Sequence, residues 1–185
     1  GAGTWGRGTW GSGSALTASG ATLRIWSHDN FGEDLLFNVR DQGIFYWDKT
    51  SGLSARGVEL SSLSGANTTP TIAKKVLVSD ADRHIIAFGC DPQNNIGVQD
   101  PLLIRFSSQE SLTDWESTAT NTAGDLRIGS GSEIITAVET RQQVLVFTDT
   151  SLHAMQFLGP PFTFGINTIS ENITMAGPLA AVAVE

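Results

Sequence analysis

The chain has 185 residues, of which 40% are apolar and 16% are charged, and its formal net charge is −8. This length predicts one domain, and the combination of many apolar residues with few charges excludes an intrinsically disordered chain. The acidic balance disfavours a surface that neutralises phosphates, so we expect no sequence-specific binding of nucleic acid. No apolar run is long enough to span a membrane, and we expect no membrane partner.

Residues 1–20, GAGTWGRGTWGSGSALTASG, contain the word GTWG twice. Glycine costs backbone entropy to order and buries little surface, so this segment is expected to be a linker or a docking arm. Trp5 and Trp10 are unusual in a spacer, and they either pack on the domain's own flank or anchor a neighbouring subunit. The chain starts at Gly1 with neither Met nor a signal-peptide pattern, which we interpret as an internal cut or a processed product.

From residue 21 onward the pattern predicts strands separated by short turns, in three units of four strands that open at intervals of about 50 residues. The first unit, 21–65, is expected to contain strands at 23–29, 34–40, 43–48 and 57–63. The second unit, 72–120, is expected to contain strands at 74–80, 83–89, 101–107 and 113–118. The third unit, 131–172, is expected to contain strands at 133–139, 142–148, 151–157 and 162–170. A new opening strand is expected over 178–185.

Four antiparallel strands in a repeat of about 40–50 residues are typical of β-propeller blades. The second strands contain the apolar runs LLF, IIAF and VLVF, as expected where neighbouring blades cover both faces. The sequence therefore predicts an all-β fold of three propeller blades plus the opening strand of a fourth, with a β-sandwich as the alternative. Because propellers close with about four to eight blades, we expect the chain to be a fragment of a larger propeller.

The residues that could carry catalysis form no recognisable motif. Tyr46 lies in an apolar strand, which favours a core role, and no GxSxG elbow supports a Ser/His/Asp triad. The acidic residues of two turns are expected to be solvated: Asp29, Glu33 and Asp34 in one, Asp80 and Asp82 in the other. The arginines occupy no repeated position in the units: Arg40, Arg83, Arg105, Arg127 and Arg141. We therefore predict no enzymatic activity and no catalytic residue.

Metal and cofactor motifs are also lacking. His28, His84 and His153 form no HxH or HExxH pair, and we expect them to pack or, for His28 with Asp29, to brace a turn. A calcium ion would suit the oxygen ligands at 80–82 or 91–100, but neither segment has EF-hand spacing. Cys90 has no disulfide partner and no zinc-site spacing, so we expect it to be buried. We predict no metal and no cofactor.

Two glycine-containing segments are interpreted as structural. The segment TNTAGDLRIGSGSE (120–133) lacks the lysine and the helix of a phosphate-binding loop, so we expect a tight crossing between blades. In GPPFTFG (159–165), the two prolines predict a rigid corner at which Phe162 and Phe164 either pack or protrude. Exposed phenylalanines there would form an interface patch.

Longer stretches of the chain resemble a known class of proteins. Two segments resemble parts of structural proteins of tailed bacteriophages, namely residues 26–48 and 104–173. The resemblance depends on the sequence words TDWE, TNTAGDLRIGSGS, VFTDTSLHAMQF and GPPFTFG. Similar proteins are tail or neck components of short-tailed phages, related to the tubular nozzle and tail-stabilisation proteins. The resemblance implies a virion location and a β-propeller within a ring-shaped homo-oligomer beneath the portal. Other copies of the chain and other tail, neck or portal proteins are the partners that it implies.

The sequence is compatible with two functions of different classes. One is a structural virion protein without catalytic activity, and the alternative is a propeller that binds or hydrolyses a carbohydrate. A set of glycan pockets would place aromatic residues at equal positions in each blade. Trp26, Trp47 and Trp115 instead fall on the first, third and fourth expected strands of their units, which favours the structural protein.

Overall fold

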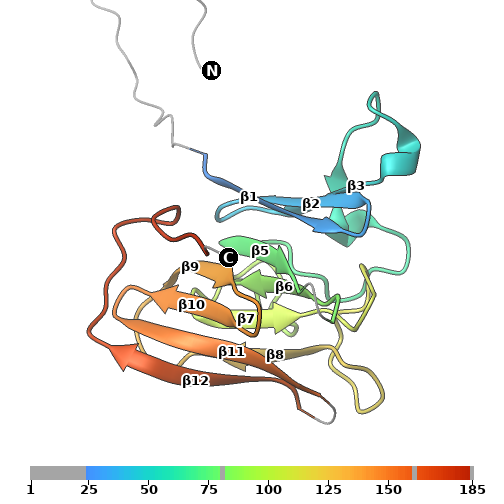
Figure 1. Cartoon of the computed structure of the whole chain (residues 1–185). Coiled ribbons are helices and arrows are strands. Elements are labelled where there is room, and N and C mark those ends of the chain that lie inside the picture. The colour runs from blue at the N-terminus through green and yellow to red at the C-terminus, as the bar shows by residue number, and fades with distance from the viewer. Residues whose placement is uncertain (1–23, 80–81, 160–161, 184–185) are drawn as a thin grey trace, which may run out of the picture.

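The computed structural model describes residues 24–79, 82–159 and 162–183, which form twelve β-strands (Figure 1). Within these ranges there is no α-helix, and the helical content is two short 3₁₀ turns, Lys49–Ser51 and Leu60–Ser62. The prediction of an all-β fold is confirmed. None of the helices in the described ranges could cross a membrane. The expected arm with Trp5 and Trp10 lies outside the described residues.

The strands form three four-stranded antiparallel sheets. The first sheet contains β1 (Trp26–Phe31), β2 (Asp34–Val39), β3 (Ile44–Trp47) and β4 (Val58–Glu59). The second contains β5 (Lys75–Val78), β6 (Ile85–Phe88), β7 (Leu103–Phe106) and β8 (Gly124–Arg127). The third contains β9 (Ile134–Glu139), β10 (Val144–Thr148), β11 (Ser151–Gly159) and β12 (Thr163–Glu171). Within each sheet, neighbouring strands are also neighbours in the sequence. The first and third sheets fall within the predicted units 21–65 and 131–172, whereas the second sheet extends past residue 120, the predicted end of its unit.

The second sheet is packed between the other two. Successive side chains of a strand point to opposite faces, and on β6 Ile85 and Ala87 pack with the first sheet, whereas Ile86 and Phe88 pack with the third. Every residue of β6 and β7 is consequently buried, which explains the nearly continuous apolar run of IIAF. This arrangement has three layers, whereas a β-sandwich has two.

Equivalent strands of successive sheets lie next to each other. The first strands are in contact, β1 with β5 and β5 with β9, and the fourth strands β8 and β12 are in contact as well (Figure 1). At the edge of β5, the backbone N–H groups of Val76 and Val78 donate to Ser27 Oγ (3.2 Å) and Asp29 Oδ2 (2.8 Å). The sheets therefore meet through side chains instead of a continuous ladder. Asp29 was expected to brace a turn with His28. Its carboxylate instead accepts the hydrogen bond from Val78 of the second sheet.

The expected strand over 113–118 is wrong. The fourth strand of the second sheet is β8, beyond the expected end of that unit at residue 120, and it pairs with β7. The expectation of a crossing between blades over 120–133 is therefore wrong for 124–127, and only 128–133 connect the second sheet to the third. Trp115 instead lies in a loop, 1% exposed, and its carbonyl oxygen accepts a hydrogen bond from the buried Arg105. The physical reason is that Arg105 holds this loop against the face of the second sheet, while the edge of β7 is occupied by β8.

Two further expectations concern the end of the chain. Residues 178–183, the described part of the expected opening strand 178–185, are not in a strand. A strand forms only against a pairing partner, and the described residues supply none there. In the segment 159–165, Phe162 is 74% exposed and Phe164 is 4% exposed, so one protrudes and the other packs.

Candidate functional site

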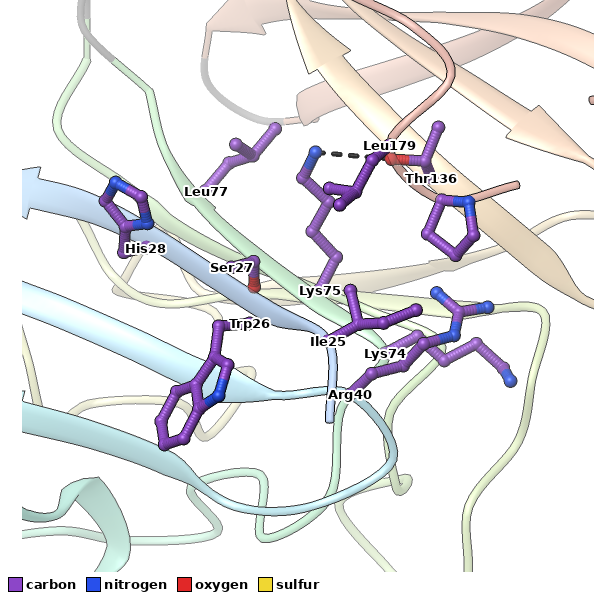
Figure 2. A pocket seen from close by; sticks show the side chains of 11 residues that line it. Ile25, Trp26, Ser27, His28, Arg40, Lys74, Lys75, Leu77, Thr136 and Leu179 are labelled. Atoms are coloured by element: carbon purple, nitrogen blue, oxygen red, sulfur yellow. Dashed lines mark hydrogen bonds between the residues drawn. The ribbon is translucent and has the colours of Figure 1, made fainter. Parts of the chain in front are cut away.

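A pocket of about 190 Å³ lies where the first strands of the three sheets meet (Figure 2). β1 contributes Trp26, Ser27 and His28, β5 contributes Lys75 and Leu77, and β9 contributes Thr136. Ile25, Arg40, Lys74, Pro178 and Leu179 complete the lining. The pocket thus combines apolar walls with several basic side chains, in a chain whose net charge is −8.

One side of this pocket is a network of charged residues that joins the three sheets. Lys74 Nζ donates to Glu133 Oε2 (2.7 Å) and to Asp41 Oδ1 (3.1 Å). Arg40 donates to the carbonyl oxygens of Ile135 (2.8 Å) and Ile134 (3.3 Å) and lies 3.9 Å from the Glu133 carboxylate. Arg40 and Asp41 follow β2, Lys74 precedes β5 and Glu133 precedes β9. The network therefore fixes the relative position of the sheets at one end of their first strands.

The opposite side of the pocket is formed by Lys75. Its ammonium donates to Thr136 Oγ1 at 3.2 Å and points away from Lys74, as Figure 2 shows. Burial lowers the pKa of Lys75, and the positive charge of Arg40 acts in the same direction, whereas Asp29 opposes it. The pocket thus contains a partly buried ammonium that donates to a hydroxyl group.

The tyrosine and arginines considered for catalysis have structural contacts. Tyr46 donates its hydroxyl to Asp34 Oδ2 at 2.6 Å, and burial together with this contact raises its pKa. The Arg105 guanidinium is buried and donates to the carbonyl oxygens of Thr68 (2.7 Å), Trp115 (3.0 Å) and Asp91 (3.2 Å). The remaining arginines are dispersed: Arg83 over the ring of Phe31, Arg127 at Asp100 and Arg141 between β9 and β10.

A serine and a histidine do come together inside the third sheet. Ser151 Oγ lies 2.8 Å from His153 Nε2, and Ser130 Oγ lies 3.2 Å from the same nitrogen. The other ring nitrogen faces Thr168 Oγ1 at 3.2 Å, where a catalytic triad would place a carboxylate. Ser151 is 1% exposed and His153 is 4% exposed, so this is a buried network of hydroxyl groups. Ser151 and His153 lie two residues apart on β11, whereas Thr168 comes from β12 and Ser130 from the segment before β9, and these two partners are not apparent in the local sequence.

Two further titratable groups named from the sequence, His84 and Cys90, are buried. His84 is fully buried against the rings of Phe106 and Phe164, and burial lowers its pKa. Cys90 is buried, as expected, and burial raises the pKa of its thiol.

Of the two candidate calcium segments, only 91–100 is described in full, since residues 80–81 lie outside the described ranges. Asp91 accepts from the backbone N–H groups of Thr71 and Gly97, and Asp100 accepts from Arg127. Their carboxylates therefore serve as structural anchors. Across the described residues, no group of three or more His, Cys, Asp or Glu side chains is arranged to hold a metal ion.

A scan of protein-family models finds no family that matches the chain, and a search of curated proteins finds no relative.

Proposed function

We propose that this chain is a structural, non-enzymatic component of the tail or neck of a phage virion, and that its three sheets are blades of a β-propeller. The resemblance of residues 26–48 and 104–173 to structural proteins of tailed phages supports the virion assignment. The contacts between equivalent strands support the propeller, because blades of a propeller place their first strands around a common axis.

The observation that carries the proposal is the contrast between the covered middle sheet and the two outer faces. On the first sheet, Leu36 and Ile44 are buried against the second sheet, whereas Phe37 and Phe45 on the opposite face stay partly exposed. Their rings stack at 5.4 Å, and Trp26, 50% exposed, lies 6.1 Å from Phe37. This row of aromatic side chains is suited to packing against a further sheet.

The third sheet has a corresponding outer face. Val144 and Val146 are buried against the second sheet, and the alternation of β10 places Leu145 and Phe147 on the opposite face, where both are partly exposed. Burial of apolar surface contributes about 25 cal/mol per Å², so covering both outer faces would stabilise an assembly considerably. Under the proposal, the outer faces of the first and third sheets are covered by other parts of the assembly. These are further blades, other copies of the chain in a ring, or other tail, neck or portal proteins.

The test is to search for the chain in purified virions of a phage that encodes it. Trypsin cleaves after Arg127 and Arg141, so the peptide IGSGSEIITAVETR (128–141) provides a specific mass-spectrometric marker. We expect this peptide in particles at a constant ratio to the portal protein, and antibody labelling at the tail or neck. Its absence from particles, while it is abundant in the lysate of infected cells, would contradict the proposal.

A further inference from the structure

The pocket between the first strands contains one positive charge that the surrounding carboxylates do not neutralise. Lys74 and Arg40 share the carboxylates of Glu133 and Asp41, two cations with two anions. Lys75 has no ion pair within the described ranges, and its one hydrogen bond there is to Thr136. An ammonium has three N–H donors, so two of them remain for a ligand.

The acidic side chain that interacts with Lys75, Asp29, is already hydrogen-bonded to the backbone. Asp29 interacts electrostatically with Lys75, but its two carboxylate oxygens accept from the N–H groups of Asn30 and Val78, both at 2.8 Å. Rotating Asp29 toward Lys75 would leave the N–H group of Val78 without its partner, at a cost of about 1–3 kcal/mol for a buried donor. Asp29 is therefore retained at the edge of β5.

The walls around the ammonium limit the ligand to a small one with an apolar part. Ile25, Leu77 and Leu179 lie beside Lys75 in Figure 2. The volume of about 190 Å³ is below the range of about 300–1,000 Å³ that is typical of sites for drug-sized molecules. The pocket is open to solvent on the side of Leu179, which is 76% exposed, so a ligand can reach the ammonium and form short, charge-assisted hydrogen bonds with it.

We infer that this pocket binds a carboxylate on a short aliphatic chain, with the carboxylate on Lys75 Nζ and the chain against Ile25, Leu77 and Leu179. Thr136 positions the ammonium for this contact. The carboxylate is carried either by a free small molecule or by an acidic side chain of a neighbouring polypeptide segment. The inference is independent of the virion proposal, because it depends only on the pocket.

Butyrate is a suitable probe, and butyramide is its uncharged counterpart of the same shape. Titration into the full 185-residue chain, followed by NMR of the lysine ammonium groups and leucine methyl groups, reports binding at the pocket. We expect saturable shifts at Lys75 and Leu179 with butyrate and none with butyramide. A glutamate-containing peptide and its glutamine counterpart, titrated in the same way, distinguish a side-chain carboxylate from a free one.

The variant Lys75→Met keeps the length of the side chain and removes its charge, so we expect butyrate to bind at least about tenfold more weakly. Lys75→Arg should retain binding, and Thr136→Val should weaken it while leaving the charge in place. Lys49→Met is the matched control, since Lys49 is paired with Glu33 outside the pocket. Equal binding of butyrate and butyramide, unchanged binding in Lys75→Met, or no saturable shift in the unaltered chain would each overturn the inference.

Discussion

Lys74 and Glu133 occupy the same position in successive sheets, each directly before the first strand, and their side chains meet at 2.7 Å. The Lys74 side chain is 8% exposed, whereas the Glu133 side chain is 42% exposed. The ion pair is thus largely buried at its basic end and open to water at its acidic end. It connects two segments that are distant in sequence at the point where the sheets converge.

Replacing Lys74 with Met should destabilise the chain by about 2 kcal/mol, because Glu133 and Asp41 would lose the charge that they share. Glu133→Gln should have a smaller effect, since Lys74 retains Asp41 and the carboxylate is partly solvated. Urea unfolding of both single variants and the double variant measures the coupling. Lys49→Met, which removes an exposed pair with Glu33, should change stability by about 0.5 kcal/mol or less. Equal effects at Lys49 and Lys74 would contradict this prediction.

Arg105→Lys should destabilise the chain by about 2–4 kcal/mol, although the charge is conserved. The guanidinium satisfies the carbonyl oxygens of Thr68, Asp91 and Trp115 at once, and a lysine ammonium cannot reach all three from one atom. The change should also expose Trp115, which fluorescence would detect as a red shift. The control Arg127→Lys alters an exposed arginine and should have little effect. A stable Arg105→Lys chain with unchanged fluorescence would show that the loop is held in another way.

Stability should fall as the pH falls below about 6.5. Burial lowers the pKa of His84 and of His153 below the ordinary value of about 6.5, and for His84 the charge of Asp82 only partly opposes this. As the pH falls through this value, the unfolded chain therefore binds more protons at these histidines than the folded chain does. The state that binds more protons is favoured by acid, so the unfolded state gains. Unfolding by urea at several pH values measures the slope. The variant His84→Phe/His153→Gln should flatten it, and a flat curve for the unaltered chain would refute the prediction.

The chain alone should self-associate or bind a hydrophobic dye, because the outer faces of its first and third sheets carry aromatic side chains. The substitutions Phe45→Thr and Phe147→Thr should reduce dye binding and lower the sedimentation coefficient. Leu53→Thr is the control, since Leu53 is an isolated loop residue that is 95% exposed. A cooperative monomer that binds no dye would show that these faces need no partner.

The strands were predictable where apolar residues form a local pattern. KKVLVSD and RHIIAFG predict β5 and β6 within two residues or fewer at each end. The error over 113–118 has a long-range cause, because the role of Trp115 depends on its contact with Arg105, and the pairing of β8 depends on β7. Neither partner is visible in the local sequence.

The candidate site was only partly accessible from the sequence. Lys74 and Glu133 mark the beginnings of the second and third predicted units, and their opposite charges at equivalent positions were a usable signal. The contact between Lys75 and Thr136 was not predictable, because it depends on how β5 of one sheet packs beside β9 of the next.

The two hydrogen bonds that Ser27 and Asp29 accept at the edge of β5 also restrict how the protein can assemble. An unpaired strand edge is a template on which a strand from another molecule can add. At β5 this template is blocked, since the outward N–H groups of Val76 and Val78 already have partners. A strand from another chain therefore cannot extend the second sheet at this edge, and growth of an assembly is directed to the faces of the outer sheets.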